Sequence, residues 1–490
     1  MADHSPAGGE ALTLAETFNV YFLQVPTYHL IVEVLLVVYI LRLLLSKTSD
    51  KPKEVKLTKE EEDELIAEWQ PEPLIPKGYP GDHSVDDAPI VTGAPGTDIV
   101  VNGKKCLNLG TFNFLGFAGN QSVKDAAAKS VRKYGVGSCG PRGFYGTIDI
   151  HLDFEKKLAE FLHYEEAVLY SFGYATTSSA IPAYSTRNDT IFCDEGVCFA
   201  IQRGIEASRS KVKYFRHNDM DHLESLLEEK LQQEKKNPAK AKKTRKVIVV
   251  EGLYLNYGDL APLPKLVELK KKYSTPLIID ESFSFGVLGG TGRGALEHFG
   301  LSSNDVDLNC ISAEVSLASI GGLSCGKSHI VDRQRLSGQG YCFSASLPPL
   351  QAAAAIEALS IMDKSPEMFN QLRNNARRLR ELLKGIKGIK VCGESFSPLI
   401  HLQLSDTMGS REQDDDVLQQ IVDKCYENGV IMVRSKYLEN EYCMPPPSGE
   451  VIDVFPSHYS IRVTVMHEHI DDDLIRAADV IKKAVKERLK

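Results

Sequence analysis

Between residues 95 and about 350, short apolar runs alternate with amphipathic segments. The runs EAVLYS, TIFCD, RKVIVVEG, TPLIID and LNCISA are rich in β-branched residues and end in polar or glycine turns, as buried strands do. Segments such as DHLESLLEEKLQQEKK and LPKLVELKKKY repeat apolar residues at helical spacing. The alternation predicts an α/β domain with a mainly parallel sheet between helices, whose ligands gather at the carboxyl ends of the strands.

The pattern changes at about residue 350. An alanine- and leucine-rich helical segment, LQAAAAIEALSIM, leads into IKVCGESFSPLIHLQLS and YSIRVTVMHEHIDDDLIRAADVIKKAV. These segments predict a second, smaller α+β domain. We therefore expect a large domain over residues 95–349 and a small domain over residues 350–490.

The N-terminal part has one long apolar segment. Tyr28 to Leu45 has 18 residues, of which 13 are Leu, Ile or Val. These contribute roughly 6 kcal/mol of favourable insertion free energy. Glu33 and Arg42 lie near the ends of the segment, where a charged group can reach the interface. We expect a transmembrane helix over residues 28–46; the alternative is a helix that lies in the membrane interface or is buried against a partner.

Charges flanking this segment predict its orientation. Residues 1–27 contain no Lys or Arg, whereas several lysines follow the segment closely, so we expect a luminal N-terminal segment and a cytosolic bulk. A cleaved signal peptide would begin nearer the N-terminus and would carry a basic region, so we do not expect this segment to be one. Residues 47–94 read as a linker and arm with a short helix near 58–69, and the proline-rich QPEPLIPKGYPGDHS predicts no regular structure. The basic run at 235–246 is either a solvated loop or a contact for anionic lipid.

Composition excludes several classes of function. The net charge of −9 argues against nucleic acid as a main partner, which would need a basic surface. The ten cysteines are scattered and include no C-x-x-C pair. This spacing excludes the common zinc motifs, so we expect no metal, and it predicts reduced thiols rather than a disulfide framework.

A glycine-dense turn at YGVGSCGPRGFYGT runs into an amphipathic helical segment that ends near residue 162. Closely spaced glycines permit tight turns and a near approach of the backbone to a ligand or another chain. Together with the motifs below, this segment resembles the α-oxoamine synthase family over roughly residues 95 to 485. The resemblance implies an aspartate-aminotransferase-like fold (pyridoxal-phosphate fold type I) and the condensation of an amino acid with an acyl-CoA.

Several family positions are intact. The resemblance implies that Asp280, in TPLIIDESFSFG, pairs with the pyridine nitrogen of the cofactor. It implies that Gly173 and Tyr174, in SFGYATT, belong to the turn around the cofactor phosphate, and that Arg462, in YSIRVTVMHEH, holds the carboxylate of the amino acid. The alternative for Asp280 and Arg462 is an inherited role in local hydrogen bonding.

Four positions depart from the family pattern. Val315, in SAEVSLASIGG, stands where the family has its cofactor-binding lysine, and no other lysine lies in that segment. Cys198 stands at the position of the ring-stacking histidine, with Ala200 beside it in place of a serine, and Phe283 replaces a second histidine. Because a Schiff base needs an amine and valine has none, we expect this chain to contain no catalytic residue.

Active sites of this family form between two subunits, so the resemblance implies pairing with a lysine-bearing catalytic homologue that binds pyridoxal 5'-phosphate. It further implies L-serine and palmitoyl-CoA at the shared site, a product 3-ketodihydrosphingosine, an endoplasmic-reticulum membrane, a small membrane activating subunit and Orm-type regulators. The residues expected at the boundary with the partner's active site are Gly137, Cys139, Gly140, Arg142, Gly143, Phe144, Tyr145, Phe343, Ser344, Ala345 and Ser346.

Two other functions remain open at this point. The chain is either a self-sufficient synthase with an unusual base or a structural or sensing membrane protein without a transferase partner. For Cys139, the alternative to a boundary position is a small buried thiol in a tight turn.

Overall fold

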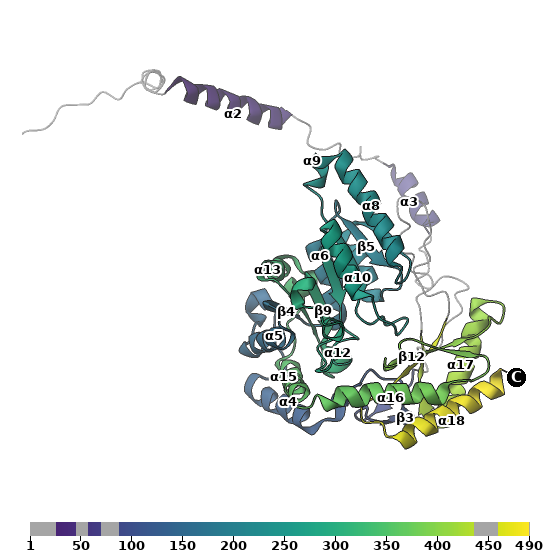
Figure 1. Ribbon diagram of the computed structural model, residues 1–490. Helices are drawn as coiled ribbons and strands as arrows, with labels where there is room; N and C mark the ends of the chain where they lie inside the picture. Colours follow the sequence, from purple (N-terminus) through teal and green to yellow (C-terminus); the bar gives the residue numbers. More distant parts are fainter. Residues whose placement is uncertain (1–25, 46–56, 70–87, 436–458, 490) are drawn as a thin grey trace, which may run out of the picture. The chain divides into compact units, whose positions relative to one another are not determined.

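The predicted strands lie in one seven-stranded sheet with the order β4-β10-β9-β8-β7-β5-β6 (Figure 1). The chain is seen in a computed structural model that describes residues 26–45, 57–69, 88–435 and 459–489. The strands are β4 (Glu166–Tyr170), β5 (Thr190–Asp194), β6 (Lys211–Phe215), β7 (Lys246–Glu251), β8 (Leu277–Asp280), β9 (Leu308–Ser312) and β10 (Gly322–Gly326).

The sheet is mainly parallel, as predicted. Only β10 runs antiparallel to its neighbours, with Gly322 opposite Tyr170 of β4 and Ser312 of β9. The parallel set of β9, β8, β7, β5 and β6 places its carboxyl ends along one edge. Helices on both faces bury these strands, which explains their nearly continuous apolar sequences.

The helices of this part follow the order of the chain. Among the described residues they are α4 (Gln121–Tyr134), α5 (Asp149–Leu162), α6 (Gly173–Tyr184), α7 (Phe199–Ser208), α8 (Met220–Lys236), α9 (Pro238–Ala241), α10 (Leu263–Tyr273), α11 (Ala295–His298), α12 (Ala313–Ser316), α13 (Ser328–Ser337), α14 (Gln339–Cys342) and α15 (Pro349–Lys364). Short turns lie at η2 (Phe117–Gly119), η3 (Arg142–Gly146) and η4 (Ser303–Asp305). α6 packs against α7, β9 and β10, and α15 packs against α4 and α5.

The C-terminal part is built on two smaller sheets. One has the order β11-β12-β15-β14 and the other β1-β2-β3-β13. Figure 1 shows α16 and α18 side by side along the small domain, and the two helices contact each other. The elements are β1 (Val91–Thr92), β2 (Asp98–Val101), β3 (Lys104–Asn108), α16 (Glu367–Leu383), β11 (Ile389–Cys392), β12 (Leu399–Leu404), α17 (Arg411–Glu427), β13 (Val430–Ile431), β14 (Val433–Arg434), β15 (Ile461–Thr464) and α18 (Asp471–Arg488).

Two large apolar cores divide this part of the chain. Phe369 and Leu372, in the first half of α16, belong to the core around the seven-stranded sheet. Leu379 and Leu383, in the second half, belong to a second core that also includes Leu107 from β3. The two cores therefore meet along α16, and the domain boundary at residues 349 and 350 stays a prediction.

The first 87 residues form a separate unit, in which two helices are described. α2 (Thr27–Leu45) contains an 18-residue apolar stretch with a mean hydropathy of 2.1, which is long and apolar enough to cross a membrane. α3 (Lys59–Glu68) matches the predicted short helix and begins with a capping box between Thr58 and Glu61. The predictions for residues 1–25 and for the proline-rich segment lie outside the described residues.

Candidate cofactor site and subunit boundary

Four parallel strands end in polar residues at the carboxyl edge of the large sheet: Asp194 of β5, Glu251 of β7, Asp280 of β8 and Ser312 of β9. Asp280 is buried; Oδ2 accepts a hydrogen bond from the Thr177 hydroxyl at 2.7 Å, and Oδ1 accepts one from the Ser282 backbone N–H at 2.8 Å. Burial raises the pKa of Asp280, against the opposing effect of these hydrogen bonds. This predicted residue therefore sits at its strand end with local partners on both oxygens.

A second carboxyl group lies beside Asp280. Glu251 accepts hydrogen bonds from the backbone N–H groups of Cys198 at 2.5 Å and Leu255 at 3.1 Å. Burial, followed by the charge of Asp280, raises the pKa of Glu251 well above its ordinary value. Burial also raises the pKa of the Cys198 thiol well above its ordinary value, so the ring-stacking position holds a buried neutral thiol.

Val315 lies in α12, directly after β9, and its residue surface is only 5% exposed. It belongs to the apolar core around the large sheet. Lys327 follows β10 as the N-cap of α13, on the surface, and the segment from residue 308 to 326 contains no lysine. The position at which the resemblance predicts a lysine is thus a core position in this chain.

Gly173 and Tyr174, which the resemblance assigns to a phosphate-binding turn, begin α6. The Gly173 N–H donates to Glu314 Oε1 at 3.0 Å, so a side chain of this chain already occupies that donor. A Cβ atom at Gly173 would overlap the Ser312 hydroxyl, which explains the glycine. The exposed ring of Tyr174 stacks on Phe199, with centroids 5.9 Å apart. The sequence motifs did not point to Glu314, although it directly precedes Val315.

Arg462, on β15, lies over an aromatic pair. Its Cζ is 4.5 Å from the centroid of the Phe112 ring, and Phe112 meets Phe283 edge to face at 5.0 Å. His401, on β12, lies opposite Arg462 of β15. Burial, followed by the charge of Arg462, lowers the pKa of His401 to about 4. Phe283 is therefore part of an aromatic cluster that supports the guanidinium.

A triad of His217, Asp194 and Asp259 lies at the same sheet edge and was not predicted from the sequence. His217 Nδ1 lies 2.8 Å from Asp194 Oδ1, and His217 Nε2 lies 3.0 Å from Asp259 Oδ2. The imidazole also stacks on Tyr257, with centroids 3.9 Å apart. Burial alone would lower the pKa of His217, but the hydrogen bonds and charges of Asp194 and Asp259 raise it to about 10. The triad ties the chain after β6 to the turn at residues 258–259.

The glycine-dense turn and the FSAS segment lie together. The backbone N–H and the hydroxyl of Ser346 both donate to the carbonyl oxygen of Gly140 at 2.9 Å. The Ser138 hydroxyl donates to the carbonyl oxygen of Ser346 at 3.0 Å. A Cβ atom at Gly146 would overlap the carbonyl oxygen of Gly140 and approach the Ser346 hydroxyl. We call residues 137–146 and 343–346 the paired loops.

The paired loops expose large aromatic side chains. Phe144, Tyr145 and Phe343 are 69%, 103% and 82% exposed, although apolar rings usually avoid water. Tyr145 has a φ of 63°, a left-handed conformation that directs a bulky residue outward at a cost in backbone strain. Cys139 is also exposed and has a φ of 60°, so in this chain it is not the buried thiol of the alternative interpretation.

Arg142 is a correction to the predicted boundary set, because its side chain points into the protein. Its guanidinium donates to both carboxylate oxygens of Glu155, at 2.8 and 3.2 Å, and to the carbonyl oxygen of Leu169 at 3.3 Å. The side chains of Arg142 and Glu155 are only 4% and 7% exposed. Arg142 therefore holds the base of the paired loops instead of forming part of their surface.

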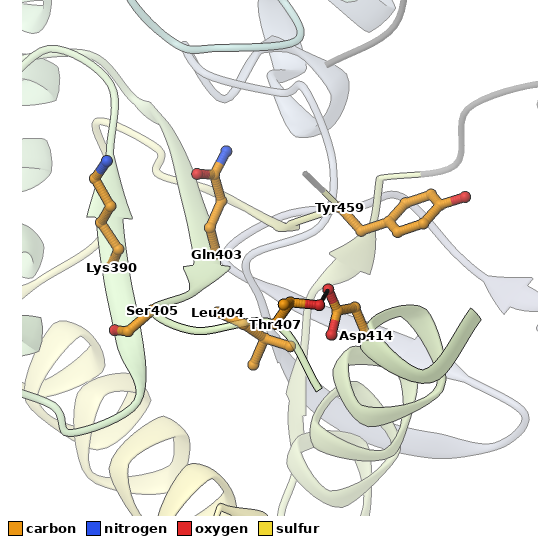
Figure 2. Close-up of a pocket in the computed structure, with 7 residues that line it drawn as sticks. All are labelled: Lys390, Gln403, Leu404, Ser405, Thr407, Asp414 and Tyr459. Atoms are coloured by element: carbon orange, nitrogen blue, oxygen red, sulfur yellow. Dashed lines mark hydrogen bonds between the residues drawn. The ribbon is translucent and has the colours of Figure 1, made fainter. Parts of the chain in front are cut away.

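Two hollows elsewhere in the described chain lack these residues. One, of about 110 Å³, is lined mainly by polar side chains of the small domain, with Leu404 among them (Figure 2). Within it the Thr407 hydroxyl donates a hydrogen bond to Asp414 at 3.0 Å. A second, of about 290 Å³, lies beside Arg373 and Phe396. Neither contains a predicted site residue.

The profile of the aminotransferase class I and II family matches residues 104–477, and the chain therefore belongs to this family of transferase folds. Within it, the chain is 42% identical over 462 residues to serine palmitoyltransferase 1 of Dictyostelium discoideum, covering 93% of each protein. It is 39% identical to long chain base biosynthesis protein 1 of Arabidopsis thaliana, covering 94% of this chain and 92% of that one. The chain belongs with these serine palmitoyltransferase subunits.

A solved structure agrees with this placement. The serine palmitoyltransferase of Sphingomonas wittichii superposes with a TM-score of 0.71 at 25% identity, covering 88% of this chain and 96% of that chain. The α/β fold type predicted from the motifs is thus confirmed.

Pyridoxal phosphate is the cofactor that this fold family implies, and the residues of this chain do not fit it. Val315 has no amine for a covalent bond, and the carboxylate of Glu314 occupies an N–H donor of the phosphate turn. The thiol of Cys198 is buried and offers no aromatic ring to stack on the cofactor. No chemical step is therefore assigned to a cofactor in this chain.

Proposed function

We propose that this chain is the non-catalytic, obligatory subunit of serine palmitoyltransferase. It pairs with a lysine-bearing homologue that holds pyridoxal phosphate, and the pair condenses L-serine with palmitoyl-CoA to 3-ketodihydrosphingosine, the first step of sphingolipid synthesis. The observation that carries the proposal is the valine at position 315, buried in the core of a chain that otherwise matches serine palmitoyltransferase 1 over nearly its whole length.

The paired loops supply the part of the shared site that this chain contributes. Their exposed aromatic side chains, Phe144, Tyr145 and Phe343, offer the kind of surface that protein interfaces cover. Internal hydrogen bonds between Gly140 and Ser346 keep the two loops in one arrangement. Preorganised loops of this kind shape a neighbouring pocket without taking part in the chemistry.

Membrane attachment through α2 suits substrates with a long acyl chain. Each buried CH₂ group favours an apolar environment by about 0.8 kcal/mol, so a membrane gives the acyl chain and the product a local solvent. We place the chain in the endoplasmic-reticulum membrane as a single-pass protein with a luminal N-terminus. A small membrane activating subunit and Orm-type regulators are the further partners that family resemblance suggests.

A mild-detergent pull-down of the tagged full-length chain tests the proposal. We expect to recover a homologue with a lysine at the position of Val315, together with serine-dependent release of CoA from palmitoyl-CoA. Borohydride reduction followed by peptide mapping should find the cofactor attached to that homologue and to no lysine of this chain, at about half a cofactor per transferase-fold chain.

Two results would overturn the proposal. Turnover by the purified chain alone would identify a self-sufficient synthase. Failure to recover any transferase homologue from membranes in which the chain is intact would identify a structural or sensing protein.

A further inference from the structure

The N-terminus of α6 is capped by a carboxylate from the segment that replaced the cofactor lysine. We infer that Glu314, an exposed residue whose carboxylate reaches the first N–H group of α6, takes the place of the cofactor phosphate in this chain. This inference rests on membership of the fold family and not on the existence of a partner.

The contact follows from two short elements. α12 begins directly after β9, and the Ser312 hydroxyl caps it by accepting from the Glu314 N–H at 3.1 Å. α6 begins at Gly173, whose missing side chain lets the helix approach Ser312 closely. This approach brings Glu314 Oε1 to 3.0 Å from the Gly173 N–H.

A carboxylate suits this position for the same reason as a phosphate. The first N–H groups of an α-helix have no partner within the helix and lie at the positive end of its dipole. Helix N-termini in nucleotide- and cofactor-binding folds use these groups to bind phosphate. The N-cap of α6, Phe172, offers no side-chain acceptor, so Glu314 supplies the anion that the helix otherwise lacks.

Residues that the resemblance assigns to the cofactor ring and the substrate also have partners within the chain. Phe283 meets Phe112 edge to face, and the Arg462 guanidinium lies over Phe112, so aromatic and guanidinium groups already contact one another there. Asp280, the expected partner of the pyridine nitrogen, accepts hydrogen bonds from Thr177 and Ser282. Both the anion position and the ring position thus have internal partners.

Phosphate binding by the full-length chain in detergent tests the inference. We would measure the thermal unfolding midpoint against inorganic phosphate at constant ionic strength. The unaltered chain should show no saturable response. Glu314→Ala should gain one, with binding at least about tenfold tighter than in the unaltered chain. Glu314→Gln keeps an acceptor oxygen but loses the charge, and it should show a smaller gain.

Glu367→Ala is the matched control, because Glu367 is an exposed glutamate in the first turn of another helix, α16. It should respond like the unaltered chain, which separates a specific site from general stabilisation by phosphate. Pyridoxal phosphate should bind Glu314→Ala no more tightly than inorganic phosphate does, since Val315 has no amine to hold its aldehyde.

Three outcomes would overturn the inference: phosphate binding by the unaltered chain, no gain in a folded Glu314→Ala, or pyridoxal phosphate binding that far exceeds phosphate binding. If Glu314→Ala does not fold, the absence of any gain in Glu314→Gln decides against it. None of these outcomes bears on partner recovery, so the inference and the proposed function fail separately.

Discussion

The carboxyl edge of the large sheet and the paired loops belong to the same fold, but they match the sequence pattern of the family to different degrees. At the sheet edge, the family resemblance predicts a lysine and two histidines where this chain has Val315, Cys198 and Phe283. In the paired loops, the glycines and serines that carry the resemblance are present, and hydrogen bonds between Gly140 and Ser346 join them. On this interpretation the chain lacks the reactive groups but keeps the loop geometry.

This difference indicates which property the chain needs. A fold that no longer bound anything would gain by relieving the left-handed backbone at Tyr145 and covering its exposed rings. At the sheet edge, by contrast, Val315 and Phe283 pack in apolar surroundings and Glu314 caps a helix. The side chains at the sheet edge therefore have partners within the chain. The paired loops, by contrast, keep a strained backbone and exposed rings unless another protein covers them.

The largest effect is expected at the base of the paired loops. Arg142→Ala leaves the Glu155 carboxylate buried without its bidentate partner, so the free energy of unfolding should fall by about 3–5 kcal/mol. Urea unfolding of the full-length chain in detergent measures the loss. Lys133→Ala is the control, because its ion pair with Asp149 is exposed and should contribute little to stability. Equal losses in the two variants would show that the buried pair does not hold the loops.

At the sheet edge, restoring the lysine should not restore the chemistry. Val315→Lys places an amine at a position that is 5% exposed, and we expect a loss of about 2–3 kcal/mol in unfolding free energy. Cys198 and Phe283 still lack the imidazoles of the family, so turnover by the isolated variant should stay at background in a CoA-release assay. Val315→Met, an apolar replacement, should be much less destabilising. Substantial turnover by Val315→Lys would contradict the site described above.

The triad at the sheet edge should make stability depend on pH. The pKa of His217 is raised to about 10 in the folded chain from an ordinary value of 6.5, because Asp194 and Asp259 outweigh the effect of burial. Its stabilisation is therefore complete below pH 6.5 and is lost as the pH rises through about 10. Between pH 7 and pH 9 it should fall by up to about 1.4 kcal/mol per pH unit.

His217→Gln tests this dependence by removing the titrating group. Unfolding free energies measured at pH 7, 8 and 9 should show a shallower slope in His217→Gln than in the unaltered chain. His329→Gln, at an exposed histidine on α13, should keep the original slope. Identical slopes in all three proteins would mean that the triad stays equally stable in its neutral form.

Much of the large domain could be predicted because its strands are buried on both faces. Continuous apolar runs such as those of β7 and β8 leave few alternatives to a central parallel strand. β10 gave no such signal, since GLSCG has no β-branched residue and its place depends on pairing with β4 and β9. β6 is an edge strand whose lysines interrupt its apolar pattern.

Site residues could be predicted where they stand in a recognisable sequence motif. They could not be predicted where the fold brings together residues from distant parts of the chain. Asp280 and Val315 stand in recognisable segments, so their positions could be expected. Arg142 stands in such a segment too, but its inward direction depends on Glu155, which lies 13 residues away. Glu314 contacts Gly173 across 141 residues, and only the packing of α6 against β9 makes that contact. Sequence spacing alone does not encode either partner.

A further effect is expected at the close contact within the paired loops. In Gly146→Ala the new methyl group overlaps the carbonyl oxygen of Gly140, so the loops must separate, at an expected cost of about 1–3 kcal/mol. Gly143→Ala is matched to it, because a Cβ atom at Gly143 has no neighbour within 4 Å in the described chain. Gly146→Ala should recover less of the lysine-bearing homologue in quantitative pull-downs, whereas Gly143→Ala should retain it unless the partner approaches that position. Reduced recovery with Gly143→Ala alone would mean that the partner contacts the exposed side of the turn and that its internal geometry matters less than its surface.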